Sequence, residues 1–434
     1  MSEWRALCEV AETNPESLSG ATNRDYLFKY IDLSAVQHGQ IEWNAIQETR
    51  FIDAPSRARR VVRLGDVLFG TVRPALQSHG CIDQQNQTDL IASTGFSVIR
   101  AIEGKADPHY LRHYVLSTTV LRQALNAAVG SNYPAVNDSD VQQFRIFAPA
   151  LAEQSAIARI LDTLDTQIEK TQAIIAKLEH VKEGLLHDLL TRGVDEKGEL
   201  RPSAEEAPEL YRESELGLIP RGWALQSLED VAPLDRSVLR TGPFGSSLKG
   251  EHWREIGRPV ITIGSLANNR FIHTELLFVD EQTAAALADF TLRPGDIVFS
   301  RVADVGRSVV VTEAENQWIM SSNFIRISVN GQIMRPRFLQ LLLASSTTVR
   351  SQLRATVNSA GRDVVNSGIL MQLRFLTPPL EEQDEIIEKV VTVENRLTRE
   401  SNALLKLNAE KSGLMDDLLT GRVRVPLFLA DLNT

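Results

Sequence analysis

The sequence has few of the features that mark exported, membrane-bound or metal-dependent proteins. Only two of its 434 residues are cysteines, Cys8 and Cys81, which excludes a disulfide framework and a cysteine-based zinc module. The apolar runs are short, as at 341–344, and fall far below the ~18 residues that span a bilayer. The first ten residues lack a basic start and an apolar stretch, so we expect no signal peptide. The chain is therefore expected to be soluble and cytoplasmic, without a membrane partner.

The motifs of nucleotide, methyl-donor and zinc chemistry are also missing. Residues 245–250 read Gly-Ser-Ser-Leu-Lys-Gly, which is no phosphate-binding G-x-x-x-x-G-K-[ST] loop. No G-x-G-x-x-G follows a predicted strand, so a dinucleotide or S-adenosylmethionine pocket lacks its fingerprint. His109 and His113 have the spacing of two zinc ligands on a helix, but no glutamate stands between them, and we expect surface histidines. We expect no catalytic residue, metal or cofactor in this chain.

Charge is unevenly distributed along a chain whose net charge is −10. Residues 193–216 carry eight acids and three basic residues and supply half of that total. Residues 50–73 carry six arginines and two aspartates, and residues 331–362 carry five arginines and no acid. Local basic segments on an acidic chain fit contacts with phosphate better than the total charge suggests.

An internal repeat is the strongest feature that is present. At an offset of 229 residues the matches include Arg145 with Arg374, Pro149 with Pro378, Glu153-Gln154 with Glu382-Gln383, and 188–191 with 417–420. Residues 65–69 return as 295–299 at an offset of 230. The chain is therefore a globular part, a helix, a second globular part and a second helix.

Both predicted helices carry a heptad stripe of apolar residues, the pattern of a coiled coil. The positions expected to form this seam are Ile157, Leu161, Leu164, Ile168, Leu178, Leu185, Ile386, Val390, Val393, Leu397, Leu404 and Leu414. Two equal stripes most simply pair with each other as an antiparallel coiled coil, with the globular parts related by a pseudo-two-fold axis. Alternatively, each stripe packs on its own globular part. Gly184 and Gly413, at equal places in the two helices, suggest close backbone approach or a kink.

The fold class expected is α+β, with two mixed α/β domains in tandem separated by the two helices. The expected division is a first globular domain (1–150), a first long helix (151–192), an acidic linker (193–216), a second globular domain (217–378), a second long helix (379–421) and a C-terminal tail (422–434). Strands are expected at 60–69, 94–99, 297–301, 308–312 and 324–329, and helices at 108–129 and 336–356.

Polar and basic loops occupy matching places in the two copies but carry different residues. Clustered arginines beside a strand suit phosphate contacts and bidentate reading of guanine. An edge charged against aggregation and plain Gly/Ser turns are the alternative interpretations. The expected DNA contacts are Arg57, Arg59, Arg60, Arg73, Ser131, Asn132, Tyr133, Ser246, Ser247, Lys249, Arg301, Arg307, Asn358 and Arg362. A repeated scaffold with unlike loops predicts two different targets.

These features together resemble the specificity subunit of type I restriction–modification systems, over essentially the whole chain. The resemblance rests on the duplicated Pro-x-Leu-x-Glu-Gln-x-x-Ile helix starts and the duplicated Asp-Leu-Leu-Thr helix ends. It also rests on residues 216–223 (Leu-Gly-Leu-Ile-Pro-Arg-Gly-Trp), 242–246 (Gly-Pro-Phe-Gly-Ser) and 295–301. The first copy departs from the pattern, because Trp4 is not followed by a Gly-Pro-Phe-Gly-Ser segment.

The resemblance implies two target-recognition domains, each reading one half of a bipartite, asymmetric site in double-stranded DNA. The paired helices would fix the spacing and dock two methyltransferase (modification) subunits, which carry S-adenosylmethionine, while restriction/motor subunits carry ATP and Mg. The other hypotheses are a structural adaptor that does not touch DNA and a self-contained enzyme. The basic segments count against the adaptor, and the missing cofactor motifs count against the enzyme.

Overall fold

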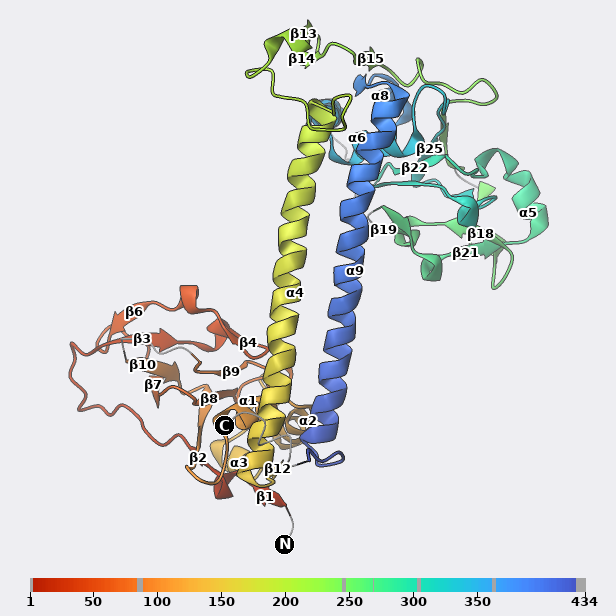
Figure 1. The fold of residues 1–434 in the computed structure, drawn as a ribbon. Helices are drawn as coiled ribbons and strands as arrows, with labels where there is room; N and C mark the ends of the chain where they lie inside the picture. Colours follow the sequence, from red (N-terminus) through yellow and green to blue (C-terminus); the bar gives the residue numbers. More distant parts are fainter. Residues whose placement is uncertain are drawn as a thin grey trace. The chain divides into compact units, whose positions relative to one another are not determined.

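The computed structural model describes residues 3–83, 89–243, 247–267, 269–302, 306–360 and 364–426, and of 356–360 it describes the backbone alone. The chain forms two compact units. Unit 1 combines the residues up to Ile174 with those from Glu400 onward, and unit 2 is Ile175–Arg399. Two long helices, α4 (Leu151–Thr191) and α9 (Leu380–Leu418), pass from one unit into the other. Each unit therefore holds a globular part and a segment of both helices (Figure 1).

Unit 1 has two four-stranded sheets. One is antiparallel, in the order β2-β11-β8-β9, and the other is mixed, in the order β6-β3-β10-β7, with β3 and β10 parallel. Its strands are β1 (Trp4–Ala6), β2 (Ala11–Thr13), β3 (Leu27–Ile31), β4 (Val36–Gln37), β5 (Gln40–Ile41), β6 (Glu48–Arg50), β7 (Ala58–Val62), β8 (Val67–Gly70), β9 (His79–Cys81), β10 (Leu90–Ser93), β11 (Phe96–Ala101) and β12 (Arg145–Phe147). Its short helices are α1 (Pro108–Val115), α2 (Thr118–Ala127) and α3 (Asp138–Gln142).

Unit 2 repeats this plan, except that the fourth strand of its mixed sheet lies at the other edge. Its sheets have the orders β16-β25-β22-β23 and β17-β21-β18-β24, and β18 is again parallel to β24. Its strands are β13 (Tyr211–Ser214), β14 (Gly217–Pro220), β15 (Ala224–Gln226), β16 (Leu239–Thr241), β17 (Trp253–Arg254), β18 (Arg258–Ile261), β19 (Leu266–Ala267), β20 (Arg270–Phe271), β21 (Leu277–Val279), β22 (Ile297–Ser300), β23 (Ser308–Val310), β24 (Ile319–Met320), β25 (Phe324–Ile327) and β26 (Phe375–Thr377). Its short helices are α5 (Glu281–Ala286), α6 (Pro336–Ser345), α7 (Thr347–Ala360) and α8 (Ser367–Met371). The α+β class and the tandem domains are confirmed.

Three predicted elements are each divided in two in the structure. The strand expected at 60–69 is two strands in different sheets, β7 and β8, because Gly65 takes φ = +84° and turns the chain between them. Gly295 makes the same turn in unit 2, with φ = +86°. The helix expected at 108–129 is α1 and α2, because the Ser117 side chain accepts a hydrogen bond from the amide of Val120 and starts a new helix. The helix expected at 336–356 is likewise divided, into α6 and α7.

The heptad seam of the long helices lies inside the structure as predicted, since its twelve positions are all buried or half-buried. In unit 1, Ile157 and Leu161 share a core with Tyr110 of α1 and with Leu418 from the end of α9. In unit 2, Ile386 and Val390 share a core with α6 and with the end of α4. The helices therefore pack against each other, and the start of each also packs on its own globular part.

The repeated Glu-Gln pair explains how each helix start is fixed. The side-chain amide of Gln154 donates to the backbone carbonyl of Pro149 at 2.9 Å and accepts from the backbone N–H of Asp107 at 3.0 Å. The side-chain amide of Gln383 donates to the backbone carbonyl of Pro378 at 2.9 Å and accepts from the backbone N–H of Arg335 at 2.7 Å. Both glutamines are buried, so these bonds anchor α4 to α1 and α9 to α6.

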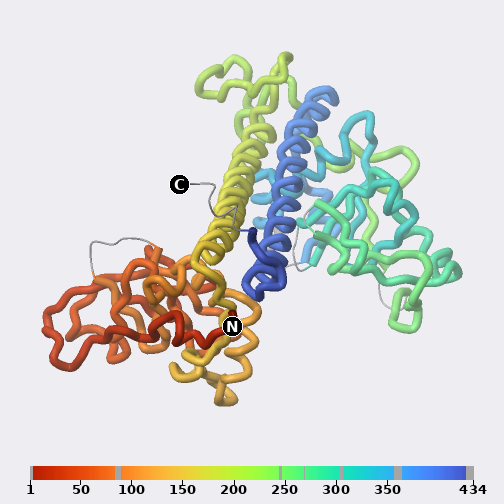
Figure 2. Tube along the Cα trace, turned by 60° about the horizontal axis from the view of Figure 1, so that its bottom comes forward, coloured from red at the N-terminus to blue at the C-terminus, as the bar shows by residue number. Residues whose placement is uncertain are grey.

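The glutamate of each pair holds the segment that follows the other helix. In unit 1, Glu153 accepts two hydrogen bonds from Arg424, at 2.8 and 2.6 Å, and one from the amide of Val425. Figures 1 and 2 both show the end of α9 beside the start of α4. In unit 2, Glu382 accepts from Arg201, the amide of Val194 and the indole of Trp223. The start of one helix therefore meets the end of the other, as an antiparallel pair requires.

The expectation for the helix glycines is wrong. A Cβ added to Gly184 or Gly413 would meet no atom within 4 Å, and both residues lie inside uninterrupted helices. Neither close backbone approach nor a kink accounts for them in this structure.

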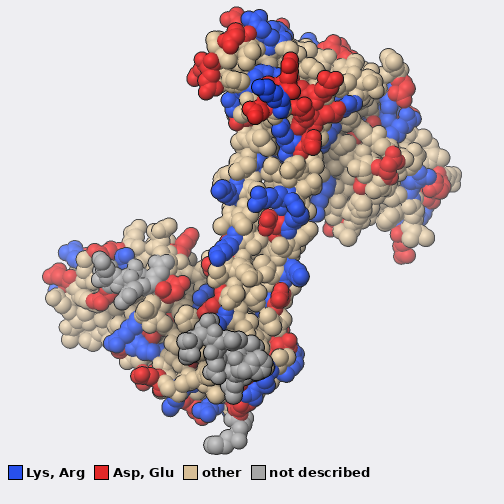
Figure 3. All heavy atoms as spheres, in the orientation of Figure 1, with Lys and Arg blue, Asp and Glu red and all other residues tan. Residues whose placement is uncertain are grey.

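The acidic segment 193–216 is more structured than its charge pattern predicts. Its first residues pack on Glu382, and its last strand, β13, pairs with β14. Figure 3 shows acidic side chains gathered where β13 and β14 lie. In the described part of the chain, no helix has the length and apolar character needed to cross a membrane.

Candidate nucleic-acid interface

The predicted loops of unit 1 meet at one backbone junction. The amide of Thr71 donates to the carbonyl of Gly95, and the amide of Val136 donates to the carbonyl of Thr71, both at 2.9 Å. The same two bonds recur in unit 2, from Arg301 to Asn323 at 3.1 Å and from Val365 to Arg301 at 3.0 Å. We call this arrangement the loop junction. It joins the chain after β8 or β22, the turn before β11 or β25, and the loop before α3 or α8.

The loop junction of unit 1 brings Arg73 to the predicted loop 131–133. The guanidinium lies 4.2 Å from the centroid of the Tyr133 ring, and its Nη2 donates to the carbonyl of Asn132 at 3.4 Å. Arg73 has φ = +49°, a left-handed conformation that is strained for a side chain of this size. Tyr133 is 68% exposed, and Ser131 and Asn132 are exposed as well. An exposed aromatic ring stacked on a cation suits contact with both a phosphate and a base.

Arg57 stands beside the same junction, because its carbonyl accepts a hydrogen bond from Thr94, the residue before Gly95. Its Nε donates to the Tyr30 hydroxyl at 3.1 Å and its Nη2 donates to Asp32 at 2.7 Å. Burial raises the pKa of the Asp32 carboxyl, but hydrogen bonds from Ser34 and Tyr30 and the charge of Arg57 outweigh it, so the net shift is downward. The hydrogen bond to Tyr30 and the charge of Asp32 raise the pKa of Arg57. Asp32 therefore stays ionised and Arg57 stays charged.

The other arginines of segment 50–73 each donate a hydrogen bond to another group of this chain. Arg60 is mostly buried and donates to Asp138 at 2.9 Å, so it joins β7 to α3. Arg59 donates to the carbonyl of Ala58 and lies 4.8 Å from the Phe51 ring. Arg63 donates to Glu16 and Arg50 to Asp53. The segment is therefore less of a basic patch than its sequence indicates, and Arg57 and Arg73 are its strongest candidates.

In unit 2 the structure places fewer of the predicted residues. Arg301 lies at the loop junction itself, and its Nε donates to the carbonyl of Val365 at 3.3 Å. Arg307 donates to the carbonyl of Leu266 at 2.7 Å, and Ser247 and Lys249 are exposed. Ser246, Arg362 and the side chain of Asn358 lie outside the described residues.

Sequence reasoning passed over two residues of unit 2 that share a surface. Arg350 and Arg354 lie one turn apart on α7, and both are exposed. Their i, i+4 spacing inside a predicted helix, within a segment that has no acid, is the signal that could have found them.

His109 and His113 were expected at the surface. This expectation is wrong for His113, which is fully buried. Its Nε2 lies 2.7 Å from Asp162 Oδ1, and His109 Nδ1 lies 3.0 Å from Asp162 Oδ2. The neighbouring Asp165 pairs with Lys411 of α9, and Arg112 lies within 4.0 Å of both aspartates. Because these cations balance the carboxylates, we interpret the cluster as a polar network that holds α1 against α4 and α9.

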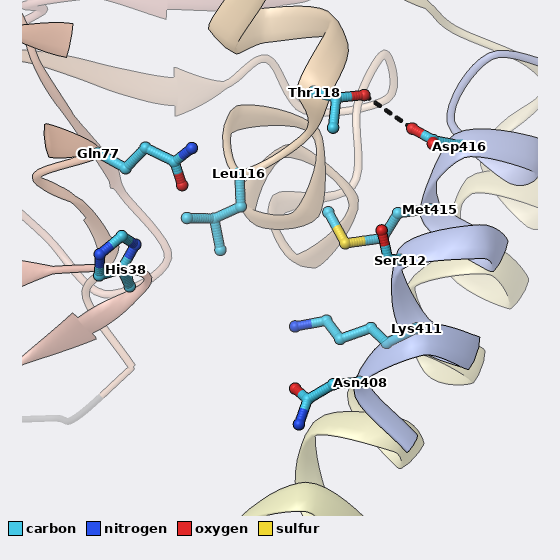
Figure 4. A pocket seen from close by; sticks show the side chains of 9 residues that line it. All are labelled: His38, Gln77, Leu116, Thr118, Asn408, Lys411, Ser412, Met415 and Asp416. Atoms are coloured by element: carbon cyan, nitrogen blue, oxygen red, sulfur yellow. Dashed lines mark hydrogen bonds between the residues drawn. The ribbon is translucent and has the colours of Figure 1, made fainter. Parts of the chain in front are cut away.

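A pocket of about 220 Å³ lies in unit 1 between the start of α2 and the end of α9 (Figure 4). Leu116 and Met415 contribute apolar surface to it. Its Asp416 accepts a hydrogen bond from Thr118 at 2.7 Å, and its Lys411 pairs with Asp165. The charged groups that line the pocket therefore have partners within the chain.

The chain matches one family model and several curated proteins. The model described as the type I restriction modification DNA specificity domain matches residues 66–180 and 220–407, well over half of the chain. The type I restriction enzyme MjaVIII specificity subunit of Methanocaldococcus jannaschii is 23% identical over 300 residues, which cover 68% of this chain and 66% of that protein. A putative type I restriction enzyme MjaX specificity subunit of the same organism is 21% identical over 431 residues, 98% of this chain and 94% of that one.

The fold also has a solved counterpart. The type I restriction–modification S subunit from M. genitalium aligns with a TM-score of 0.57 at 12% identity, covering 96% of this chain and 95% of that chain. At this identity the likeness concerns the fold alone. It agrees with the two repeated α+β parts and the two long helices described above.

Proposed function

Because the chain belongs to the family of type I restriction–modification DNA specificity domains, we propose that it is the non-catalytic subunit that gives such a complex its DNA sequence specificity. Each unit reads one half of a bipartite, asymmetric site in double-stranded DNA. The partners are two methyltransferase subunits, which hold S-adenosylmethionine, and restriction/motor subunits, which hold ATP and Mg. The complex acts in the cytoplasm, where the DNA is.

The loop junction is the observation that carries this proposal. The two units share its backbone hydrogen bonds, yet Thr71 of one unit is replaced by Arg301 in the other. The two units hold their loops in the same places, but the loops carry different side chains. This difference supports the proposal that the units read two different half-sites. Phosphate contacts position such a protein, and side chains that reach base edges give it specificity.

We predict that Arg73→Ala changes recognition of one half-site and Arg301→Lys changes recognition of the other. Loss of one arginine contact to a base costs about 1–3 kcal/mol of discrimination. The measurement is methylation, by the complex with methyltransferase subunits, of DNA in which each half-site is randomised in turn. Arg63→Ala is the control. Arg63 is exposed, and it donates a hydrogen bond to Glu16 at the end of β7 that lies away from the loop junction. If either variant impaired both half-sites equally, one unit would not read one half-site.

The salt dependence of DNA binding separates this proposal from a structural adaptor. A protein that neutralises phosphates loses affinity steeply as salt rises, with a slope of about −0.9 per phosphate contacted. In an assay of this chain alone, an adaptor that does not touch DNA would give a flat dependence. We expect a steep dependence for the chain, and a smaller slope for variants that lack a phosphate-contacting cation.

A further inference from the structure

The contacts of Arg57 fix one edge of its guanidinium and leave another edge available. Tyr30 and Asp32 receive hydrogen bonds from Nε and Nη2, which form one edge of the planar group. Among the described residues no partner of Nη1 is found, and the Arg57 side chain is 57% exposed. The edge formed by Nη1 and Nη2 can therefore donate two parallel hydrogen bonds to an acceptor pair outside the chain.

Tyr30, Asp32 and Arg57 come from two strand ends at one side of the mixed sheet. Tyr30 lies in β3, Asp32 follows it and accepts from the amide of Ser34 as the cap of a 3₁₀ turn, and Arg57 precedes β7. The strand β10 separates β3 from β7, so the Arg57 side chain spans it. Their backbone positions are therefore set by the sheet.

The repeat shows that the fold does not require this polar group. At the offset of 230 residues, the positions of Tyr30, Asp32 and Arg57 are taken by Val260, Thr262 and Leu287. The structural places of Asp32 and Thr262 agree, because Thr262 also lies at the N-cap position of a 3₁₀ turn after a strand that is parallel to its neighbour. Val260 and Leu287 are buried apolar residues. Unit 2 keeps the parallel strand pair with Val260 and Thr262 in these places, so the pair does not depend on a Tyr-Asp-Arg group.

We propose that Tyr30 and Asp32 are positioning residues that hold Arg57 as the reader of a guanine in the half-site of unit 1. This inference rests on the proposed function. Guanine presents two acceptors, O6 and N7, in the major groove, and the two-donor edge of arginine matches them. A guanidinium already held by a carboxylate and a hydroxyl loses less side-chain freedom on binding than a mobile one. Arg73 and Tyr133, at the same loop junction, lie on the surface next to it.

The test uses the complex with its methyltransferase subunits and a set of duplexes in which every base pair of the half-site is replaced in turn. Wild-type protein is expected to prefer guanine at one position of the unit 1 half-site. Asp32→Asn, Tyr30→Phe and Arg57→Lys are each expected to reduce that preference by roughly tenfold, at that position only. Tyr30→Phe removes a single hydroxyl, so it keeps the test open if the other variants do not fold.

Asp53→Asn is the matched control. Asp53 accepts from Arg50 at 2.9 Å, at the opposite end of the same sheet, and both side chains are exposed. This variant should leave every base preference unchanged. The proposal is overturned if the three variants weaken binding to all sequences equally, which would mark Arg57 as a phosphate contact, or if they leave the guanine preference intact. A wild-type complex with no base preference in either half-site would instead contradict the proposed function itself.

Discussion

At the scale of single residues, the repeated motif revealed which side chains matter but not what they contact. Glu153-Gln154 and Glu382-Gln383 were visible as matched pairs, and the proline carbonyls that the glutamines bond lie only five residues away. The partners of the glutamates, Arg424 and Arg201, come from segments far along the chain that do not match in sequence. A local pattern contains no information on such pairings. The interaction of Arg57 with Tyr30 and Asp32 escaped sequence analysis for the same reason.

We predict that Glu153→Gln lowers the free energy of unfolding of unit 1 by about 1–3 kcal/mol, the usual contribution of hydrogen bonds to a charged group. The hydrogen bond from Arg424 lowers the pKa of the Glu153 carboxyl, against the opposing effect of burial. A carboxyl with a lowered pKa stabilises the fold above its unfolded value, 4.5, and this stabilisation is lost as the pH falls through the folded value.

The difference between wild type and Glu153→Gln should therefore be full near neutral pH and should shrink below pH 4.5. Chemical denaturation at several pH values measures it. A difference that stays constant across this range would show that the ionised carboxylate is not what stabilises the contact.

At the scale of elements, the long helices were the most predictable part of the molecule. A heptad stripe is a local property, and a helix that repeats it over many turns must bury its apolar face against another helix or a globular part. Shorter elements were less predictable, because single residues such as Gly65 and Ser117 end them. The prediction for the glycines of the long helices was wrong, because no neighbour approaches either glycine closely.

Replacing Gly184 or Gly413 by alanine is expected to raise the free energy of unfolding by about 1 kcal/mol each, the helix-propensity difference between these residues. The added Cβ would meet no atom within 4 Å at either site. Thermal denaturation of the single and double variants checks this expectation.

Gly193→Ala provides the contrast for that experiment. Gly193 has φ = +67°, and a Cβ there would lie 2.0 Å from Glu382 Oε1 and 2.4 Å from the Trp223 ring. This variant should lose stability. If the two helix variants lost stability as well, the interpretation of their glycines as unpacked would be wrong.

At the scale of the whole molecule, the chain is two copies of one recognition scaffold joined by helices that belong to both units. The repeat predicted the two copies, because similar sequences produce similar structures. That each long helix belongs to both units is seen only in the structure. The predicted DNA contacts stay predictions. The structure brings Arg73 beside residues 132 and 133, which the sequence did not foresee, and it pairs Arg60 with Asp138. Composition locates a basic segment, but the acids that neutralise it come from distant strands and helices.

If α4 and α9 set the distance between half-sites, inserting one heptad after Lys177 and one after Lys406 should lengthen the unread spacer of the DNA site. A heptad adds about 10 Å of helix, which corresponds to about three base pairs of DNA. Both half-site sequences should be unchanged, because no recognition loop is altered. The methylated motif of the variant complex measures the spacing. Full activity with the original spacing would contradict the role of the helices in setting it.

The measurement to make first is a methylation map of DNA from cells that express this chain with its methyltransferase partner, with and without the gene for the chain. We predict a bipartite methylated motif, two specific half-sites around an unread spacer, that disappears when the gene is deleted. A stable complex that binds DNA without sequence preference and leaves no motif would contradict a specificity subunit and favour a structural adaptor.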